Sequence, residues 1–497
     1  MTGSPLILAI DQGTGSTKCL VVDSAGEVVR RSQIPISQAT PNPGWVEQDA
    51  LEIWKSIQQA IAAAVSDDLV GNVVAVGFST QREACVIWDR KTGDPVTPLL
   101  SWQDQRTAGL CEELSDAGYA PLIREKSGLP LDPMFSAVKA KWLLDRIDPD
   151  RVKAKNGDLC IGTIDAFVLS RMGGDPIIEA GNASRTQLVD VEKAAFDAEL
   201  LDIFDIPAAA LPRIVPSVGP LPATRDLEPL PNGTPVGAVL GDSHAALFAH
   251  GALEPGPIKV THGTGSSVMG LIGDEHSRGA TKLSEGVCKT IAWWVDKPQL
   301  AFEGNIRAAG STLIWVAGLL GVDVAELAEM AKTVDGAGPV HLVPGFGGLS
   351  APWWDGSAVA VLSGFTLGTS REVVARAALD SIAHQISDVV DAVRASNLPV
   401  DALHVDGGPT RNDQLMQFEA DMSGAPVIRT RMAELSALGA AHLAGLSAGV
   451  FTVDQLKGLT RTERTFSPAI DGSRHAAMRA GWRQAVARSL SHGSWQV

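Results

Sequence analysis

Residues 7–23 read ILAIDQGTGSTKCLVVD, in which two apolar runs flank a turn of small and polar residues at 11–16. The pattern predicts a β-hairpin, because short apolar runs on either side of a glycine-containing turn can pair. Glycines let a ligand approach the backbone, and the hydroxyls of Thr14 and Ser16 add donors, so the turn can hold a phosphate. Asp11 would repel that phosphate unless a cation lay between them, which indicates a nucleotide with Mg²⁺. A hairpin turn that binds nothing explains the same residues and remains an alternative.

Length and composition are typical of a globular protein with more than one domain. A chain of 497 residues is too long for one hydrophobic core, so we expect at least two domains. The hydrophobic share of 45% and the charged share of 20% are ordinary for such proteins. The formal charge of −16 argues against nucleic acid or an anionic membrane as the main partner, and it leaves small-molecule chemistry.

The five cysteines indicate a reducing compartment. They are scattered, with no CxxC pair and no cluster of histidine and cysteine at metal-ligand spacing. We therefore expect reduced thiols, in a cytoplasm, that act as small buried hydrophobes. The opening residues MTGSPLILAID lack a basic region, and their apolar run ends at once in Asp11. Neither a signal peptide nor a membrane span is expected there.

A polar cluster follows the short apolar strand expected at 73–78. It consists of residues 79–83, STQRE, and ligands of open α/β sheets bind at such strand ends. The stretch LLSWQDQR that follows contributes an aromatic side chain, Trp102. Arg82 and Glu83 could form a surface ion pair. Together with Trp102 they could instead hold a polyhydroxy molecule, since arginine donates, glutamate accepts and the indole covers C–H groups.

The second half of the chain repeats the plan of the first. An apolar strand from Val236 runs into Gly241 and Asp242, a helix and another strand follow, and residues 263–267 form a second small-residue turn. Two such α/β halves, each with a phosphate turn, would place a nucleotide in the cleft between them. A third glycine turn at 405–412, VDGGPTRN, follows a strand and opens a helix, whose N-terminus favours anions. Three such turns in one chain are hard to ascribe to chance.

Helical periodicity marks several core helices. It predicts a helix that begins after Asp49, with that residue as its cap. A long helix is expected at 369–393, because the segment opens with the capping-box pattern Thr369 to Glu372 and has one apolar face. Residues 434–448 are rich in alanine and glycine, which allows the helix expected there to pack closely on a sheet.

These stretches together resemble the FGGY carbohydrate kinases, and within that family they resemble the glycerol kinases most. The matching stretches run in family order over nearly the whole chain: DQGTGSTK, PGWVEQDALEIW, STQREACVIWD, SWQDQR, MFSAVKAKWLLD, NASRT, GDSHAALF, HGTGS, GFGGLSAPWWD, DGGPTRNDQLMQFEAD and LGAAHLAGL. The resemblance implies an α/β fold of two ribonuclease-H-like domains, as in actin and the hexokinases, with the active site in the cleft. Residues 1–249 would form the N-terminal domain, which binds sugar or polyol and phosphate, and residues 250–497 the C-terminal, nucleotide-binding domain.

The resemblance also implies roles for single residues. Asp11 resembles the carboxylate associated with Mg²⁺, and Asp242 resembles the base that accepts the hydroxyl proton as the γ-phosphoryl of ATP arrives. A helix N-cap is the structural alternative for Asp242. The residues expected to bind the polyol are Arg82, Glu83, Trp102 and Asp242. Those expected to bind the phosphates and the nucleotide are Thr14, Gly15, Ser16, Lys18, Gly263, Thr264, Gly265, Gly310, Gly407, Gly408 and Asn412.

Several positions depart from the glycerol kinases. Lys18 stands where those enzymes have arginine, which keeps the charge and loses the bidentate fork. In the polyol pocket, Met134 replaces a tyrosine, Ser243 a glutamine and Ser267 a phenylalanine. We therefore expect a wider pocket with more hydroxyl groups, in which a four- or five-carbon polyol or ketose has a higher kcat/KM than glycerol. Asp104, in WQDQR, resembles the pentulose kinases instead.

The resemblance leaves alternatives open. Glycerol kinase proper is the alternative within the family, and a non-catalytic, actin-like ATP-binding scaffold is the alternative outside it. A scaffold has no need of the QRE and SWQDQR clusters, which together with Asp242 favour the kinase. The sequence also leaves the oligomeric state open, a homodimer included.

Overall fold

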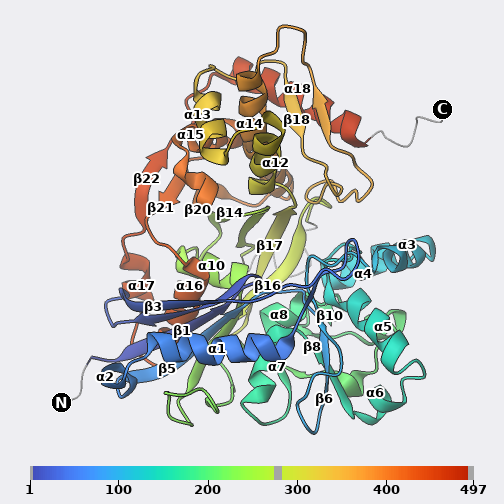
Figure 1. Ribbon diagram of the computed structural model, residues 1–497, viewed down its shortest axis with the longest axis vertical. Helices are drawn as coiled ribbons and strands as arrows, with labels where there is room; N and C mark the ends of the chain where they lie inside the picture. The colour runs from blue at the N-terminus through green and yellow to red at the C-terminus, as the bar shows by residue number, and fades with distance from the viewer. Residues whose placement is uncertain (1–3, 274–282, 491–497) are drawn as a thin grey trace. The chain divides into compact units, whose positions relative to one another are not determined.

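The chain folds into two compact units, drawn in Figure 1 from a computed structural model that describes residues 4–273 and 283–490. The first long segment of the first unit ends at Gly251, and most of the remaining chain forms the second unit. Two later segments, 289–301 and 434–460, return to the first unit. The chain therefore passes between the units several times.

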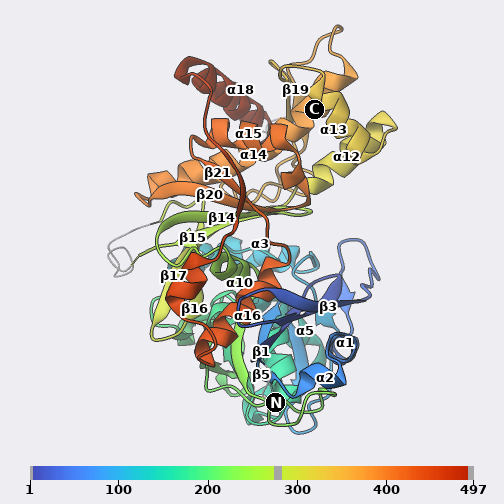
Figure 2. The same cartoon turned by 90° about the vertical axis from the view of Figure 1, so that its left-hand side faces the viewer.

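A five-stranded sheet organises the first unit (Figure 2), with the strand order β13-β5-β1-β2-β3. The strands are β1 Leu6–Gln12, β2 Ser16–Val22, β3 Val28–Pro35, β5 Val73–Thr80 and β13 Val236–Gly241. β1, β2 and β3 pair antiparallel, whereas β5 runs parallel to β1 and β13 parallel to β5. The hairpin expected at 7–23 is confirmed, with Ile7 opposite Val22 and Gln12 opposite Thr17.

Helix α1, Ala50–Ala64, covers one face of this sheet. Its buried isoleucines, among them Ile53 and Ile57, join the same hydrophobic cluster as Leu8 and Ile10 of β1. Asp49 caps α1 as predicted, because its carboxylate accepts a hydrogen bond from the backbone N–H of Leu51 at 2.8 Å.

Helix α16, Leu435–Ser447, covers the other face of the sheet. Side chains alternate between the two faces of a strand, so every second residue of β1 points toward α16 and away from α1. A Cβ at Gly77 of β5 would lie 2.3 Å from the carbonyl oxygen of Ala440, and one at Gly445 would lie 3.3 Å from the Ile7 side chain. Glycine permits this approach because it has no Cβ. The close packing expected of residues 434–448 is confirmed.

The other elements of the first unit are shorter. Its helices are α2 Asp67–Val70, α3 Ala108–Asp116, α4 Ala120–Ser127, α5 Ser136–Ile147, α6 Val152–Asn156, α7 Ile164–Arg171, α8 Ala180–Ser184, α9 Ala198–Ile203, α10 Asp242–Ala249 and α17 Val453–Gly458, with the 3₁₀ helix η1 Ala208–Ala210. Its short strands pair in twos: β4 Glu47–Gln48 with β7 Leu99–Leu100, β6 Val86–Asp89 with β8 Leu159–Gly162, β9 Ile177–Glu179 with β12 Arg213–Val215, and β10 Val189–Asp190 with β11 Ala195–Phe196.

The sheet of the second unit repeats the plan of the first, with the order β16-β17-β15-β14-β20-β21-β22. Its strands are β14 Gly256–His262, β15 Ser266–Leu271, β16 Cys288–Trp294, β17 Pro298–Ile306, β20 Val400–Gly407, β21 Val427–Thr430 and β22 Thr462–Phe466. β14 and β15 form an antiparallel hairpin, β20 runs parallel to β14, and β21 runs parallel to β20. These four strands pair as β1, β2, β5 and β13 do, so the predicted repetition is confirmed. Residues 289–301, which carry most of β16 and the start of β17, pack with the first unit.

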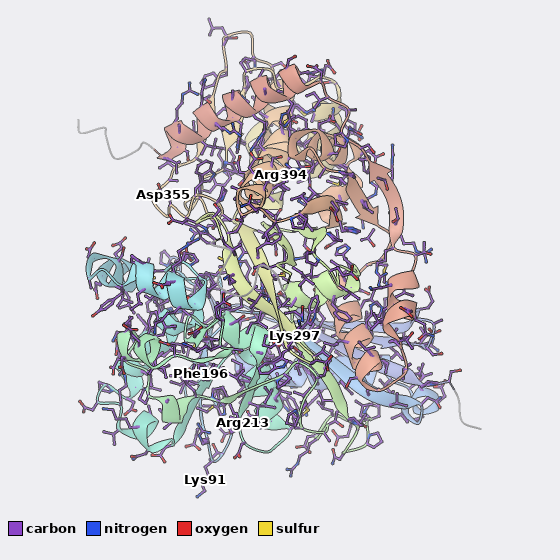
Figure 3. All side chains as sticks on the ribbon, turned by 180° about the vertical axis from the view of Figure 1, so that it is seen from behind. Lys91, Phe196, Arg213, Lys297, Asp355 and Arg394 are labelled. Carbon is purple, nitrogen blue, oxygen red and sulfur yellow. The ribbon has the colours of Figure 1, made fainter. Side chains whose placement is uncertain are left out.

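The helices of the second unit gather around α14, Arg371–Ala395. Its neighbours are α12 Gly310–Leu320, α13 Val324–Lys332 and α15 Asp413–Ser423. Arg394, labelled in Figure 3, donates from Nη1 to the Ser423 carbonyl at 2.6 Å and ties the end of α14 to that of α15. The remaining elements are β18 His341–Val343, β19 Val361–Ser363, the 3₁₀ helix η2 Gly408–Arg411 and α18 Gly472–Leu490.

The start of α14 differs from the prediction. The helix begins at Arg371 with Ser370 as its N-cap, so the capping box predicted for Thr369 and Glu372 is wrong. The hydroxyl of Thr369 accepts a hydrogen bond from the backbone N–H of Thr366 at 2.8 Å instead. Threonine can close a turn as well as cap a helix, and the local sequence does not decide between these bonds. The core role predicted for the helix is confirmed by buried residues along its length.

Helix length and hydropathy give no single membrane-crossing helix within residues 4–273 and 283–490. One pair, α12 and α13, reaches the required length and hydropathy only when the two are counted together across an 88° bend. Leu313 and Val316 of α12 are buried in the protein.

Candidate functional site

The turn between β1 and β2 is held by side chains from two other segments. The Thr14 carbonyl accepts a hydrogen bond from Gln48 Nε2 at 2.8 Å, and its hydroxyl accepts one from the Trp102 indole N–H at 2.9 Å. Gly15 at the tip is exposed, and a Cβ there would meet no atom within 4 Å. The turn thus presents open backbone, and it joins two predicted ligand contacts, Thr14 and Trp102.

Ser16 and Lys18 lie on β2, directly after this turn. The Ser16 hydroxyl accepts a hydrogen bond from Gln33 Nε2 at 3.1 Å. Lys18 stands opposite Asp11 in the β1–β2 register, so the two side chains lie on the same face of the sheet. A positive and a negative side chain therefore flank the base of the turn.

Asp11 is a buried carboxylate, with 8% of the residue exposed. The Ser79 hydroxyl donates to its Oδ1 at 2.9 Å. Burial, with a further contribution from the Asp242 carboxylate, raises the pKa of Asp11 to about 6. A carboxylate that raises the pKa of Asp11 by repulsion favours a cation between the two groups, because the cation removes that repulsion.

Three buried glutamines support the same turn from inside, a structural role that the sequence had not suggested for them. Gln81 Nε2 donates to Gln12 Oε1 at 3.2 Å and to Gln48 Oε1 at 3.0 Å. Gln12 donates in turn to the Gly13 carbonyl at 2.8 Å. A connected network of this kind fixes the backbone that it holds.

Arg82 and Asp242 form an ion pair between the ends of two parallel strands, β5 and β13. Arg82 Nε donates to Asp242 Oδ1 at 3.1 Å, and the Arg82 side chain is 6% exposed while that of Asp242 is 38% exposed. Arg82 Nη1 also lies 3.3 Å from His244 Nε2. The surface ion pair considered for Arg82 and Glu83 is therefore wrong, because both residues are buried.

Asp242 is the first residue of α10, and Gly241 occupies the N-cap position. The carboxylate Oδ1 accepts a hydrogen bond from the backbone N–H of Ser243 at 2.6 Å. Because Asp242 is not the N-cap residue, the cap role considered for it is wrong. Its partly exposed carboxylate is held in place by Arg82 and by the start of the helix.

Glu83 follows Arg82 in a left-handed backbone conformation, with φ at 59°. Such a conformation is uncommon outside glycine and costs free energy, so the surroundings must hold it. Arg185 Nε donates to Glu83 Oε1 at 2.6 Å, and Arg82 Nη2 lies 3.9 Å from the same oxygen. Two arginines thus fix the Glu83 carboxylate.

Two residues expected to line the polyol pocket, Met134 and Ser243, are partly exposed in the first unit. The Met134 backbone N–H donates to Asp132 Oδ1 at 2.9 Å.

Asp104 is fully buried, and its carboxylate accepts hydrogen bonds from Arg106 and from the Val46 backbone. The Asp104 carboxylate is therefore a support of its own loop.

The second turn, between β14 and β15, is packed far more tightly than the first. The Thr264 carbonyl accepts hydrogen bonds from the backbone N–H groups of Ala309 at 2.9 Å and Ser311 at 3.1 Å. Three predicted glycines leave no room for a side chain beside a carbonyl oxygen. A Cβ would lie 2.1 Å from the Ile306 oxygen if placed at Gly265, 2.5 Å from the Gly263 oxygen at Gly310, and 2.0 Å from the His262 oxygen at Gly407. Within the second unit, glycine thus brings together the turn, the N-terminus of α12 and the end of β20.

The third glycine turn joins β20 to α15, as predicted. Gly407 has φ at 98°, which glycine adopts without strain. A Cβ at Gly408 would meet no atom within 4 Å, so its backbone is open. Asn412 is the N-cap of α15, because its Oδ1 accepts hydrogen bonds from Gln414 N at 3.0 Å and Leu415 N at 3.1 Å.

Ser267 lies on β15 and is bonded within its own sheet. Its hydroxyl accepts a hydrogen bond from Lys259 Nζ at 3.2 Å and lies 3.4 Å from Glu303 Oε1. Both partners are buried.

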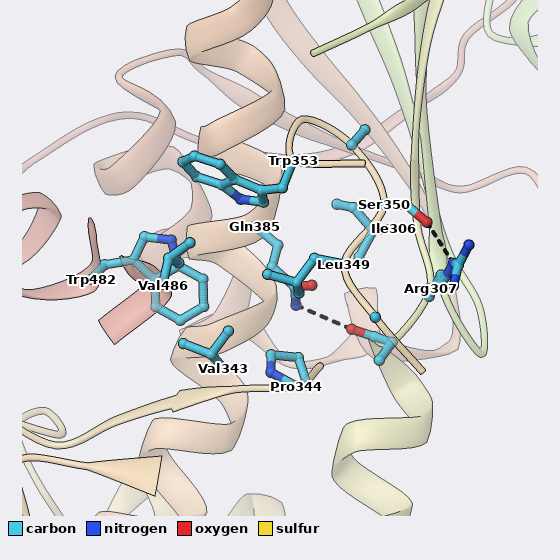
Figure 4. A pocket seen from close by; sticks show the side chains of 13 residues that line it. Ile306, Arg307, Val343, Pro344, Leu349, Ser350, Trp353, Gln385, Trp482 and Val486 are labelled. Atoms are coloured by element: carbon cyan, nitrogen blue, oxygen red, sulfur yellow. Dashed lines mark hydrogen bonds between the residues drawn. The ribbon is translucent and has the colours of Figure 1, made fainter. Parts of the chain in front are cut away.

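A small cavity beside α14 is shown in Figure 4. Two hydrogen bonds cross its wall, from Gln385 to the Ala308 carbonyl at 3.1 Å and from Arg307 Nε to the Ser350 hydroxyl at 2.8 Å. Its volume of about 10 Å³ leaves room for about one water molecule at most. A nucleotide or a polyol does not fit this cavity.

Comparison with protein families decides the class of this site. Residues 6–249 match the N-terminal domain of the FGGY family of carbohydrate kinases, and residues 258–448 match the C-terminal domain. The chain belongs to this family. It is a phosphotransferase that uses ATP and acts on an alcohol group of a polyol or sugar.

Relatives named glycerol kinase match the chain over nearly its whole length. A glycerol kinase from Dechloromonas aromatica is 42% identical over 97% of each chain. A glycerol kinase from Bacillus subtilis is 37% identical over 98% of this chain and 99% of that protein.

Solved structures confirm the two-domain α/β fold. The crystal structure of Plasmodium falciparum glycerol kinase with ADP has a TM-score of 0.91, with 29% identity over 98% of each chain. A ligand-bound xylulose kinase from Lactobacillus acidophilus has a TM-score of 0.84 over 98% of this chain and 97% of that one, and at 19% identity it shows the fold alone.

Two charged residues that bond to Glu83, and that the sequence had not suggested, share one signal. Arg185 donates to the Glu83 carboxylate, and Lys139 Nζ donates to the Glu83 carbonyl. Arg185 and Lys139 are buried charged residues inside otherwise apolar or small-residue stretches, NASRT and SAVKAKW. A long charged side chain is buried only when it is paired or hydrogen-bonded, so its position within an apolar pattern could have marked it.

Proposed function

We propose that this FGGY kinase transfers the γ-phosphoryl group of ATP to a hydroxyl of a small polyol, with Asp242 as the general base. One observation carries the proposal: the partly exposed Asp242 carboxylate is held by buried Arg82 where β5 and β13 end. Arg82, Glu83 and Trp102 would bind the polyol beside it. Ligands of α/β sheets bind at such strand ends.

The proposed reaction needs a proton acceptor and a charge neutraliser. Asp242 accepts the proton of the attacking polyol hydroxyl while the hydroxyl oxygen bonds to the γ-phosphorus. At the same time, the bond between the γ-phosphorus and the ADP oxygen breaks. The proton then passes from Asp242 to solvent. Because Arg82 and the Ser243 N–H both hold Oδ1, the carboxylate keeps one orientation throughout.

The donor set near Asp11 fits Mg²⁺. This ion is usually bound by one or two carboxylates together with substrate phosphates and water. Asp11 is buried close enough to Asp242 for the two charges to interact, and no group of three or more His, Cys, Asp or Glu residues within the described residues could hold a metal alone. Bound Mg²⁺ would neutralise phosphate charge, and Asp11 would hold it from the protein side.

The phosphates of ATP would contact the two hairpin turns. In the first unit these contacts come from Thr14, Gly15, Ser16 and Lys18. In the second unit they come from Gly263, Thr264 and Gly265, with Gly310, Gly407, Gly408 and Asn412 on the nucleotide side. Open backbone at Gly15 and Gly408 supports this assignment.

Glycerol is the first acceptor that we propose, with glycerol 3-phosphate as the product. The support is the name shared by the relatives described above, at 37–42% identity. A four- or five-carbon polyol or ketose is the second candidate, favoured by small or flexible residues at Met134, Ser243 and Ser267. A pocket with that extra volume would make additional contacts with the longer carbon chain of such an acceptor.

One assay of ADP release, coupled to a spectroscopic signal and run over a panel of polyols and ketoses, tests both candidates. Release that depends strictly on an added polyol supports the kinase. ATP hydrolysis that no acceptor changes would instead support the scaffold. A glycerol kcat/KM at least about tenfold above every longer acceptor would exclude the second candidate.

We also place the reaction in a cytoplasm. The five cysteines are all buried as thiols, and burial raises the pKa of Cys85 to about 12, which keeps it protonated and unreactive. Such thiols suit a reducing compartment, where ATP is also available.

A further inference from the structure

Lys139 is a fully buried lysine on α5, close to the residues proposed to bind the polyol. Its Nζ donates to the Glu83 carbonyl at 3.3 Å, to the Phe135 carbonyl at 3.4 Å and to the Met134 carbonyl. An ammonium group has three N–H donors, and here three carbonyls surround it. One side chain thus joins the loop that follows β5 to the segment that begins α5.

The carbonyl of Glu83 belongs to the strained residue of the site. Glu83 has a φ of 59°, and a non-glycine residue keeps such a conformation only when its surroundings hold it. The Glu83 carboxylate is fixed separately by Arg185. Lys139 therefore holds the main chain of Glu83, and Arg185 holds its side chain.

The charge on Lys139 is costly where it lies. Burial lowers its pKa to about 8, and the groups that face it are Glu83, Asp104, Asp132 and the thiols of Cys85 and Cys111. An apolar residue would pack in the helix without this cost. A buried ammonium at this position therefore calls for a role beyond filling the core.

We propose that Lys139 is a positioning residue for the acceptor site, whose ammonium holds the backbone of Glu83 and Met134 in the spacing that grips a polyol. The proposal rests on the proposed function, in which these two residues contact the acceptor. Lys139 touches neither substrate. It acts only through the carbonyls of its neighbours.

The main test replaces Lys139 by methionine, which keeps the length of the side chain and removes the three donors. We expect the KM for the preferred polyol to rise at least about tenfold, because two backbone contacts of the grip are released. The KM for ATP should stay within about twofold, since no proposed nucleotide contact bonds to Lys139. A polyol KM that stays within about twofold of wild type, or an ATP KM that rises in parallel, overturns the proposal.

Lys141→Met is the matched control on the same helix. Lys141 Nζ lies 3.4 Å from Asp145 Oδ2 and the side chain is partly exposed, so its replacement tests loss of a lysine from α5 without loss of the carbonyl contacts. We expect both KM values to remain at wild-type levels in this variant. A polyol KM raised as far as in Lys139→Met would assign the effect to the helix and overturn the proposal.

A second variant, Lys139→Arg, covers the case in which the methionine variant does not fold. Arginine keeps the charge and the donors, but its planar fork cannot point at three converging carbonyls as an ammonium does. We expect a polyol KM between those of wild type and Lys139→Met, with an unchanged ATP KM. A wild-type polyol KM in Lys139→Arg would contradict the proposed geometry.

A double-mutant cycle with Glu83→Gln asks whether Lys139 acts through Glu83. If it does, the combined loss of polyol affinity is smaller than the product of the two single losses. Independent, multiplicative losses overturn this route. The wild-type panel assay separates the hypotheses: polyol-independent ATP turnover rejects the function, whereas an active wild type with an unaffected Lys139→Met rejects only the positioning role.

Discussion

Asp242 is the residue on which the proposed chemistry depends. Asp242→Asn keeps the size of the side chain and removes the proton acceptor, and a general base typically contributes about 10²- to 10⁴-fold to turnover. We expect kcat to fall within that range while ATP affinity, measured by calorimetry, is nearly unchanged. A variant that keeps more than about a tenth of wild-type kcat would show that the base is another residue.

Ser267 is the residue at which acceptor size can be tested. Ser267→Phe adds volume at a position expected to line the polyol pocket, so we expect the ratio of kcat/KM values to shift toward glycerol and away from longer polyols. The substitution also breaks the bonds with Lys259 and Glu303. Ser267→Ala, which breaks them without adding volume, is the control and should leave the ratio unchanged. An equal shift of the kcat/KM ratio in both variants would mean that the lost hydrogen bonds cause the shift.

At the scale of elements, α8 is held by buried carboxylates. Glu179 caps α8, with Oε1 accepting from Gly181 N and Oε2 from Asn182 N, both at 2.8 Å. Asp165 Oδ2 accepts from the Glu179 backbone N–H at 3.0 Å. Helix α8 leads directly to Arg185, which fixes Glu83, so these carboxylates support the acceptor site from a distance.

Burial raises the pKa of Glu179 to about 7 and that of Asp165 to about 6. Because these values exceed the ordinary ones, the folded protein binds the protons more tightly than the unfolded chain does. The resulting stability is complete below about pH 4 and is lost as the pH rises through 6 to 7.

The pH dependence of stability should therefore change in Glu179→Gln, which cannot titrate. We expect this variant to be less stable than wild type at pH 5, because its amide places N–H groups against N–H donors. The deficit should narrow by up to about 3 kcal/mol at pH 8, where wild type has lost the protonated glutamic acid. Thermal unfolding midpoints of the variant and of wild type at both pH values measure this deficit in stability. A deficit that is the same at pH 5 and pH 8 would mean that Glu179 does not titrate in this range.

At the scale of the whole molecule, the same strand plan occurs twice with different tolerance for side chains. A Cβ at Gly265 would clash with the Ile306 carbonyl at 2.1 Å, whereas one at Gly15 would meet nothing within 4 Å. We expect Gly265→Ala to lower the thermal midpoint by several degrees and to weaken ATP binding, because backbone must shift to admit the methyl group. Gly15→Ala is the matched variant and should keep the wild-type midpoint. Equal midpoints in both variants would show that the second turn adapts freely.

Polyol affinity gives a further readout of the Gly265→Ala variant. Most residues proposed to bind the polyol lie in the first unit, among them Arg82, Glu83 and Trp102, and Gly265 lies in the second. We expect polyol affinity without nucleotide to change less than ATP affinity. A larger loss for the polyol would contradict the division of roles between the units.

Local patterns in the sequence were enough to predict the repeated α/β plan, the two hairpin turns, the helix that follows Asn412 and the kinase family. These are local patterns of apolar runs, glycines and caps, and family motifs in order, and each can be recognised without knowing what packs against it. The predicted capping box at Thr369 failed because one hydroxyl can satisfy either of two local bonds.

Only the tertiary structure decided which residues support these motifs. Burial and hydrogen bonds showed that the Asp104 carboxylate supports its loop and that the Ser267 hydroxyl is bonded within its sheet. They also showed that Arg82 holds Asp242. Hydrogen bonds likewise revealed Lys139 behind Glu83. These are contacts between residues far apart in the chain, and their partners depend on how strands and helices pack rather than on any local pattern. Sequence therefore predicts which groups do the chemistry, and packing decides which other groups hold them in place.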